Sequence, residues 1–195
     1  DPRSKSKVVV ARETDIDTHA EVLGRKPGEK HETKTTTEFG DGRSVVTKEE
    51  RQRSVGLDGV THKTSKETEA RGAEGRWKSG EEKTVQVGPK GVSIDEKKTF
   101  ESERDGKTVT LEQGRTAEIG KDGASRGTTT TLKRSDGSST TTGSTEAIER
   151  GEGKLGAAVG KSKTETDAAG TATGLAGKGK GGVMAGDKGY GGFAE

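Results

Sequence analysis

Hydrophobic residues are sparse along this chain, and they gather beside glycine-rich turns with polar residues between them. In several segments they alternate with polar residues at a period of two, which is the spacing of one face of a β-strand. The residues that share a face in two successive segments are Val92, Ile94 and Phe100, and then Val109, Leu111, Ala117 and Ile119. The pattern predicts strands with one modestly apolar face and one polar face.

Turn-like glycines recur about every sixteen residues between Gly42 and Gly153. The last glycines of successive turns lie 17, 16, 16, 15, 17, 14 and 16 residues apart. A fixed period with a recurring chemistry indicates a repeated structural unit, and Asp-Gly or Gly-x-x-Gly supplies the positive φ that hairpin turns need. These closing glycines are Gly42, Gly59, Gly75, Gly91, Gly106, Gly123, Gly137 and Gly153.

We therefore predict an all-β fold: a repetitive antiparallel meander, or a solenoid-like array, of ~16-residue units with Gly-x-x-Gly turns. The sheet is expected to be thin and polar, with an extended N-terminal strand and a Gly/Ala-rich C-terminal tail. Glycines in the middle of some units favour a break or bulge there, namely Gly80, Gly114, Gly127 and Gly143. We favour the meander of long strands over the hairpin or solenoid.

Helix is the competing prediction for two charged segments, residues 48–53 and 145–150. Neither segment carries an apolar stripe at the 3.6-residue spacing of a helix, so we predict strand or loop for both.

Three regions divide the chain. Residues 1–30 form an N-terminal arm with one strand around Val8, Val9 and Val10, residues 31–150 form the β-repeat array, and residues 151–195 are rich in Gly, Ala and Lys. The last region is either a flexible tail or an assembly segment that becomes ordered against a neighbouring subunit.

Composition argues against an ordinary globular core. Leu, Ile, Val and Phe total 27 of 195 residues, a share below the ~20% under which disorder becomes a serious expectation. However, 35 basic residues nearly balance 33 acidic ones, and 14 of the 27 apolar residues are the β-branched Val. This composition suits a thin polar β-structure as well as a solvated coil.

Composition also limits which cellular locations and which partners are compatible with this chain. The chain has no Cys, so disulfides and thiolate metal sites are excluded, and no apolar run approaches the ~18 residues of a membrane span. It begins at Asp1, which fits a mature form after removal of a targeting segment, and we expect a secreted or cell-surface protein. Opposite charges are interspersed, so we expect no nucleic-acid partner.

No catalytic, cofactor or metal site is predicted. The histidines His19, His31 and His62 lie in polar contexts without zinc-ligand spacing. The match of residues 151–156 to Gly-x-Gly-x-x-Gly lacks the strand and helix that a dinucleotide site requires. Runs of adjacent Thr point to both faces of a strand, so they do not form an ice-ordering plane; they could carry O-linked glycans. We expect Trp77 to cover a thin core rather than to stack a ligand.

The function expected from this pattern is that of a structural subunit, not an enzyme. Because a thin sheet buries little by itself, we expect copies to polymerise by β-strand addition into an extracellular filament or matrix. The candidate assembly residues lie in the two non-repeating ends: Val8, Val9, Val10, Leu155, Val159, Tyr190 and Phe193.

Two other functions stay open. The array, with units such as Asp-Gly-Lys-Thr-Val-Thr-Leu at 105–111, resembles in a general way the Thr/Gly-rich repeat proteins of bacterial surfaces. One other function is a stalk segment of an adhesin or phage fibre, in which the repeats form the stalk and binding occurs elsewhere. The mean hydropathy of −0.99 resembles that of hydrophilins, which are disordered protective proteins.

Overall fold

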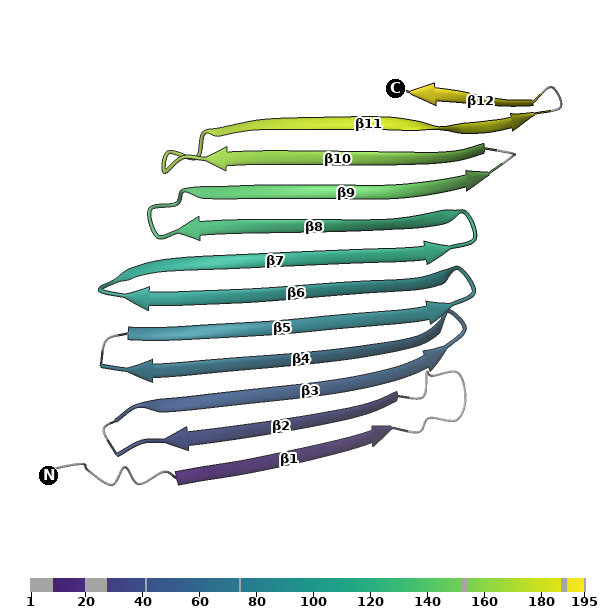
Figure 1. Cartoon of the computed structure of the whole chain (residues 1–195). Coiled ribbons are helices and arrows are strands. Elements are labelled where there is room, and N and C mark those ends of the chain that lie inside the picture. Colours follow the sequence, from purple (N-terminus) through teal and green to yellow (C-terminus); the bar gives the residue numbers. More distant parts are fainter. Residues whose placement is uncertain are drawn as a thin grey trace, which may run out of the picture.

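The fold is one open antiparallel sheet (Figure 1), as a computed structural model describes it for residues 9–19, 28–40, 42–73, 75–151, 154–186 and 189–194. Its twelve strands follow one another in sequence order, each paired with the next. The strands are β1 (Val9–His19), β2 (Gly28–Glu38), β3 (Ser44–Gly56), β4 (Gly59–Gly72), β5 (Gly75–Gly88), β6 (Gly91–Arg104), β7 (Lys107–Gly120), β8 (Gly123–Arg134), β9 (Ser139–Gly151), β10 (Lys154–Thr166), β11 (Ala172–Gly186) and β12 (Gly189–Ala194).

The all-β meander predicted from the sequence is confirmed. No helix occurs among the described residues, and the two charged segments that competed as helices lie within β3 and β9. Val8, which was predicted to share a strand with Val9 and Val10, lies outside the described residues.

The sixteen-residue period is the length of one strand plus its connection. From β4 to β7 each strand has fourteen residues, and two residues connect it to the next. The first residues of β4 to β9 are accordingly sixteen apart: Gly59, Gly75, Gly91, Lys107, Gly123 and Ser139. One unit is therefore one strand, and not the hairpin or solenoid coil of the alternative layout.

The closing glycines adopt the backbone conformation that the turns require. Seven of the predicted eight have positive φ, between 70° at Gly106 and 148° at Gly123, while Gly153 lies outside the described residues. At Gly91, with φ 130°, an added Cβ would lie 2.0 Å from the carbonyl oxygen of Ile119. Glycine is needed there because of both φ and the close approach of the neighbouring strand.

The break or bulge expected at mid-unit glycines does not occur. The strand registers continue without a shift through Gly80, Gly114, Gly127 and Gly143. At Gly80, Gly127 and Gly143 a hydroxyl from a neighbouring strand reaches over the glycine. The side-chain oxygens of Thr99, Thr116 and Ser162 are 2.7, 2.8 and 2.9 Å, respectively, from the site of an added Cβ. Side chains of the neighbouring strand occupy the space, so the backbone stays regular.

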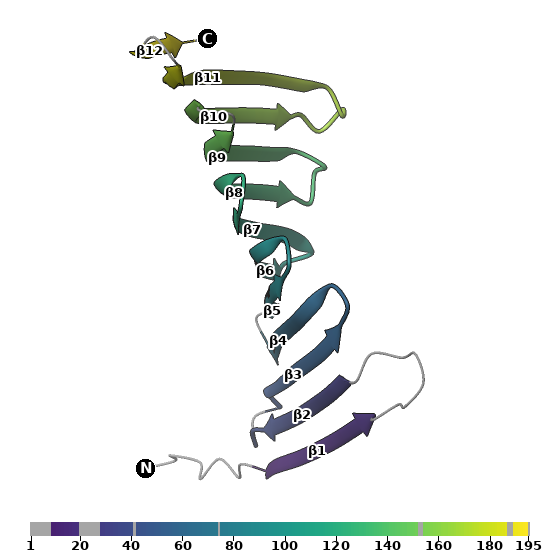
Figure 2. The same ribbon diagram turned by 90° about the vertical axis from the view of Figure 1, so that its right-hand side faces the viewer.

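The sheet is a single twisted layer (Figure 2), and it has almost no hydrophobic core. Among the side chains the structure describes, Ala70, 9% exposed, is the buried hydrophobic residue. It lies between its cross-strand partners Val45 and Trp77. With so little burial, backbone hydrogen bonds and cross-strand side-chain pairs must supply most of the stability.

The Gly/Ala-rich C-terminal segment also joins the sheet. Thirteen residues of β10 pair with β9, and β11 and β12 continue the same antiparallel order. Backbone pairing needs no large side chains, so glycine and alanine can extend the ladder although they add little burial.

Candidate functional site

The two faces of the sheet differ sharply in chemistry. Cross-strand partners point to the same side of an antiparallel sheet, so the registers assign every strand residue to a face. Within β3–β11, one face carries the large hydrophobic residues, with Val46 as the exception among the described side chains. We call it the banded face, and the other the polar face.

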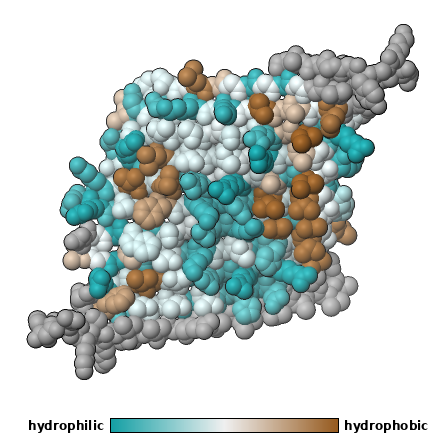
Figure 3. All heavy atoms as spheres, viewed as in Figure 1, coloured by the Kyte–Doolittle hydropathy of each residue, from teal (hydrophilic) through white to brown (hydrophobic). Residues whose placement is uncertain are grey.

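The hydrophobic residues of the banded face form two bands near the turns. The valine band comprises Val55, Val60, Val85, Val87, Val92, Ile94, Ala117, Ile119, Ala124 and Ile148, and the aromatic band comprises Val45, Ala70, Trp77, Phe100, Val109, Leu111 and Leu132. In Figure 3 hydrophobic residues gather towards the two sides of the face, with hydrophilic residues between them. Both bands are open to solvent: Ile119 is 64% exposed and Phe100 is 45% exposed.

Charged residues of alternating sign lie in the centre of the banded face between β3 and β6. Glu49, Lys66, Glu81 and Lys98 follow one another across β3 to β6 in one row. Lys66 Nζ is 2.9 Å from Glu49 Oε1, and Lys98 Nζ is 2.9 Å from Glu81 Oε1. In the adjacent row Lys83 Nζ is 2.7 Å from Glu96 Oε1. Each charge therefore has an opposite charge beside it on the next strand.

Two members of these pairs, Glu96 and Lys66, have pKa values that are shifted in the direction of the charged form. Hydrogen bonding to Lys83 and its positive charge lower the pKa of Glu96. Hydrogen bonding to Glu49 and its negative charge raise the pKa of Lys66. Because the charged forms are favoured in the folded sheet, the pairs stabilise it between the acid and alkaline limits of these titrations.

A stability maximum at intermediate pH is the expected result. A lowered carboxyl pKa contributes stability above the unfolded value of about 4.3, which is lost as the pH falls through the folded pKa. A raised lysine pKa contributes stability below about 10.4, which is lost as the pH rises through the folded pKa. Thermal unfolding followed from acid to alkaline pH should show loss at both ends, less pronounced in high salt because these pairs are half-exposed.

Glu112 provides a matched test on the polar face. Its pKa is lowered, mainly by a hydrogen bond from Lys133 Nζ at 2.9 Å. Glu112→Gln should cost about 0.2–1 kcal/mol at neutral pH and reduce the loss of stability in acid. Glu118→Gln, on the same strand and face, is the control. Equal acid sensitivity of Glu112→Gln and the unaltered chain would contradict the role of this pair.

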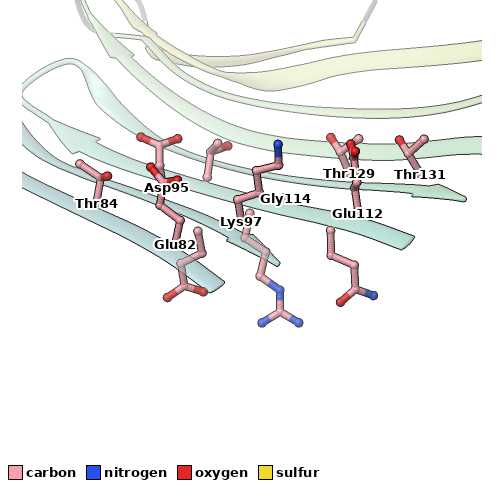
Figure 4. A pocket seen from close by; sticks show the side chains of 12 residues that line it. Glu82, Thr84, Asp95, Lys97, Glu112, Gly114, Thr129 and Thr131 are labelled. Atoms are coloured by element: carbon pink, nitrogen blue, oxygen red, sulfur yellow. The ribbon is translucent and has the colours of Figure 1, made fainter. Parts of the chain in front are cut away.

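The hollows of the sheet are open to solvent. One of about 340 Å³ lies largely over the polar face (Figure 4), beside Gly114 and among acidic and hydroxyl side chains that include Glu82, Asp95, Glu112 and Thr129. Open hollows of this kind lack the convergent, enclosed polar groups of a small-molecule site.

The described residues contain no group of three His, Cys, Asp or Glu side chains that could hold a metal ion. His31 and His62 lie on β2 and β4, with β3 between them. No helix long and apolar enough to cross a membrane occurs in the described part of the chain.

The sheet is open at both edges. One edge is β1, and the other is β12 together with the part of β11 that β12 does not reach, because β12 pairs only with Gly181–Gly186. An edge strand presents unpaired N–H and C=O groups, to which another strand can add. We call Ala172–Lys180 of β11 the open segment.

The two edges carry opposite net charge. The sequence of β1 has Arg12 against Glu13, Asp15 and Asp17, which gives −2 with His19 neutral. The open segment has Lys178 and Lys180 and no acidic residue, which gives +2. Opposite edges are thus matched to each other, and neither is matched to itself.

The structure distributes the predicted assembly residues over three places. Val9 and Val10 lie in β1 at one edge, and Tyr190 and Phe193 lie in β12 at the opposite edge. Leu155 and Val159 lie in the interior strand β10, 53% and 59% exposed on the banded face. Val8 is outside the described residues. The residues from the two ends of the chain are therefore not brought together within one subunit.

Apart from Leu155 and Val159, the banded face was not among the predicted assembly sites. The sequence already indicated this face, because residues such as Val87, Val92 and Ile119 lie at the same distance in sequence from the neighbouring turns. Only the register shows that the bands of successive strands coincide on one side.

The chain matches no protein-family model, no curated protein and no solved structure.

Proposed function

We propose that this chain is a structural subunit that polymerises by β-strand addition, with β1 of one copy pairing at the β12 edge of the next. The observation that carries the proposal is a single-layer sheet whose two open edges bear opposite charge. Charge complementarity favours joining unlike edges and disfavours joining like ones. A head-to-tail contact generates a filament when the rotation between copies does not close into a ring, and an open filament is the assembly that we propose.

Strand direction supports this junction. Neighbouring strands alternate in direction throughout, so β1 and β12 run in opposite directions (Figure 1). When β1 of a second copy lies beyond β12, the antiparallel alternation therefore continues across the junction. An antiparallel ladder is also slightly more stable per residue than a parallel one.

The sequences of the two edge strands contain few large apolar residues. In sequence, β1 contributes Val9 and Val10, and β12 contributes Tyr190 and Phe193. Main-chain hydrogen bonds give the affinity in strand addition, and alternate side chains give the specificity. We propose that these four residues set the register of the junction.

A peptide with the sequence of β1, residues 9–19, tests the proposal. It should add to the β12 edge and cap growing filaments, so that their length in negative-stain micrographs falls as the peptide concentration rises. A peptide of the same composition in scrambled order is the control. Filaments of unchanged length with both peptides, or purified protein that forms no filament at any concentration, would overturn strand addition.

The proposed location is outside the cell or on its surface, as expected from the sequence. Fractionation of the native cells, with an antibody to the array, tests it: recovery only from the cytoplasmic fraction would contradict this location. For the purified protein, a random-coil circular dichroism spectrum that persists at high concentration would favour the hydrophilin-like alternative.

A further inference from the structure

The banded face leaves an extended apolar surface without a cover. Val87, Ile119 and Ile148 of the valine band are 49%, 64% and 54% exposed, and Trp77 and Phe100 of the aromatic band are 40% and 45% exposed. We propose that the banded faces of two copies pack against each other, so that two subunits form a two-layer β-sandwich. This pairing uses a different surface from strand addition and does not depend on it.

The charged centre of the face identifies a second copy as the occupant. Glu81 and Lys83 of β5 lie beside Lys98 and Glu96 of β6, a two-by-two array in which the sign alternates in both directions. The array has two rows, one of Glu81 and Lys98 and one of Lys83 and Glu96. Consider a second copy related by a two-fold axis that runs across the strands between these two rows, so that the two banded faces meet. Each glutamate of the array then lies opposite a lysine of the second copy, and each lysine opposite a glutamate.

The same axis also pairs charges on β3. Glu49 and Arg51 occupy the two central rows there, so they too exchange places and meet the opposite sign. The alternative axis, parallel to the strands between β5 and β6, places β3 over β8. There Glu49 and Arg51 would meet Thr130 and Thr128. We therefore assign the axis that crosses the strands.

This axis superposes apolar band on apolar band. Counting outwards from the central rows, Trp77 falls opposite Val87, Phe100 opposite Ile94, and Val109 opposite Ile119. Large side chains of the aromatic band thus meet branched side chains of the valine band. Two sheets packed in this way lie about 10 Å apart, with their strands inclined by the sheet twist.

The area is sufficient for a stable dimer. With strands ~4.8 Å apart and a rise of ~3.3 Å per residue, β3 to β8 present roughly 1,000 Å² on one face. A standard interface buries about 800 Å² per partner. The proposed footprint ends before β10, where Lys161 and Lys163 occupy the two central rows and would repel their counterparts.

The centre and the bands have different roles in this interface. Burial of the bands provides the driving force. The central ion pairs contribute less to affinity, because removing charges from water offsets their attraction. They fix the register, since a shift by one strand would bring like charges together.

Two double variants with equal added charge test the proposal. Val87→Lys/Ile119→Lys places two lysines in the valine band, and Gln86→Lys/Ser125→Lys places two on the polar face. All four positions are exposed, so both variants should retain the β-sheet circular dichroism spectrum. By analytical ultracentrifugation, the dimer dissociation constant should rise at least about 100-fold for the first and less than about threefold for the second.

A second readout covers protein that also forms filaments. X-ray scattering should then show the ~10 Å spacing between stacked sheets, and the spacing should disappear in Val87→Lys/Ile119→Lys while filaments persist. Unaltered protein that stays monomeric at high concentration would overturn face pairing, and so would filaments of unaltered protein that lack the spacing. Equal effects of the two variants would overturn it as well, because the banded face would then have no special role.

Cross-linking tests the axis, because the chain has no Cys of its own. A short bis-maleimide should link two copies of Val109→Cys/Ile119→Cys, whose positions face each other about the assigned axis. It should not link Val109→Cys/Ala70→Cys, which would face each other about the alternative axis. The reverse result would overturn the assigned axis.

Discussion

Deleting one sixteen-residue unit should destabilise the sheet more than deleting two. The one-unit deletion removes residues 59–74, which are β4 and its connection, and the two-unit deletion removes residues 59–90. Both keep the turn at Leu57-Asp58 and place a glycine after it, Gly75 or Gly91. The two variants therefore differ in which strand comes to lie beside β3, and the two-unit variant also lacks β5.

The one-unit deletion brings like charges together. With the register of β3 unchanged, β5 takes the place of β4. Lys48 then meets Lys83, and Glu50 meets Glu81. The apolar residues are even-numbered in β4 and odd-numbered in β5. Because sixteen is an even number, the deletion puts even-numbered residues of β5 where even-numbered residues of β4 were. The bands of β5 and of all later strands therefore move to the other side of the sheet relative to β3.

The two-unit deletion restores the pattern. β6 then lies beside β3, so that Glu49 meets Lys98, Arg51 meets Glu96, and Val55 meets Val92. Each cross-strand pair contributes roughly 0.2–1 kcal/mol, so the one-unit variant should be less stable by about 1–4 kcal/mol. Urea unfolding followed by circular dichroism measures this difference. A one-unit variant as stable as the two-unit variant would show that the face pattern does not govern the fold.

Gly91→Ala should be among the most damaging of the conservative single substitutions. The new Cβ would lie 2.0 Å from the carbonyl oxygen of Ile119 and 2.8 Å from the Cα of Gly120. A φ of 130° is also strained for a residue with a side chain. These effects together should cost roughly 2–4 kcal/mol, which corresponds to a fall in Tm on the order of 5–15 °C.

Gly114→Ala is the matched control, and it should have the opposite sign. Its added Cβ would lie 4.0 Å from the Cβ of Thr129, an ordinary contact. Alanine restricts the unfolded chain more than glycine does, so this substitution in a strand should stabilise the sheet by about 0.5–1 kcal/mol. Thermal unfolding of the two variants in parallel measures both changes. A small effect of Gly91→Ala would mean that the turns can relax away from the neighbouring strand.

The order of the elements could be predicted from the sequence because the determining interactions are local. Turn glycines fix where each strand ends, and the period-two alternation fixes which residues share a face. The charged segments 48–53 and 145–150 were predicted correctly as non-helical for the same reason, since they lack an apolar stripe.

The mid-unit glycines and the C-terminal segment show where local pattern was insufficient. Gly80 and Gly127 were expected to favour a break, but hydroxyls of Thr99 and Thr116 on the neighbouring strands reach over them. The Gly/Ala-rich residues of β10 and β11 show little alternation of their own, but the backbone of β9 provides a template for them. Both outcomes depend on residues that are distant in sequence.

The features of the candidate surfaces also have either local or distant determinants in the sequence. By itself, the sequence determined a polar β-meander of sixteen-residue units with too few apolar residues for a core, because turn conformation and strand alternation act over a few residues. Only the tertiary structure decided that the bands of successive strands coincide on one face, that their central charges alternate, and that Val9 and Phe193 lie at opposite edges. These features arise from the register between strands, and each register is set by hydrogen bonds between residues that the sequence separates.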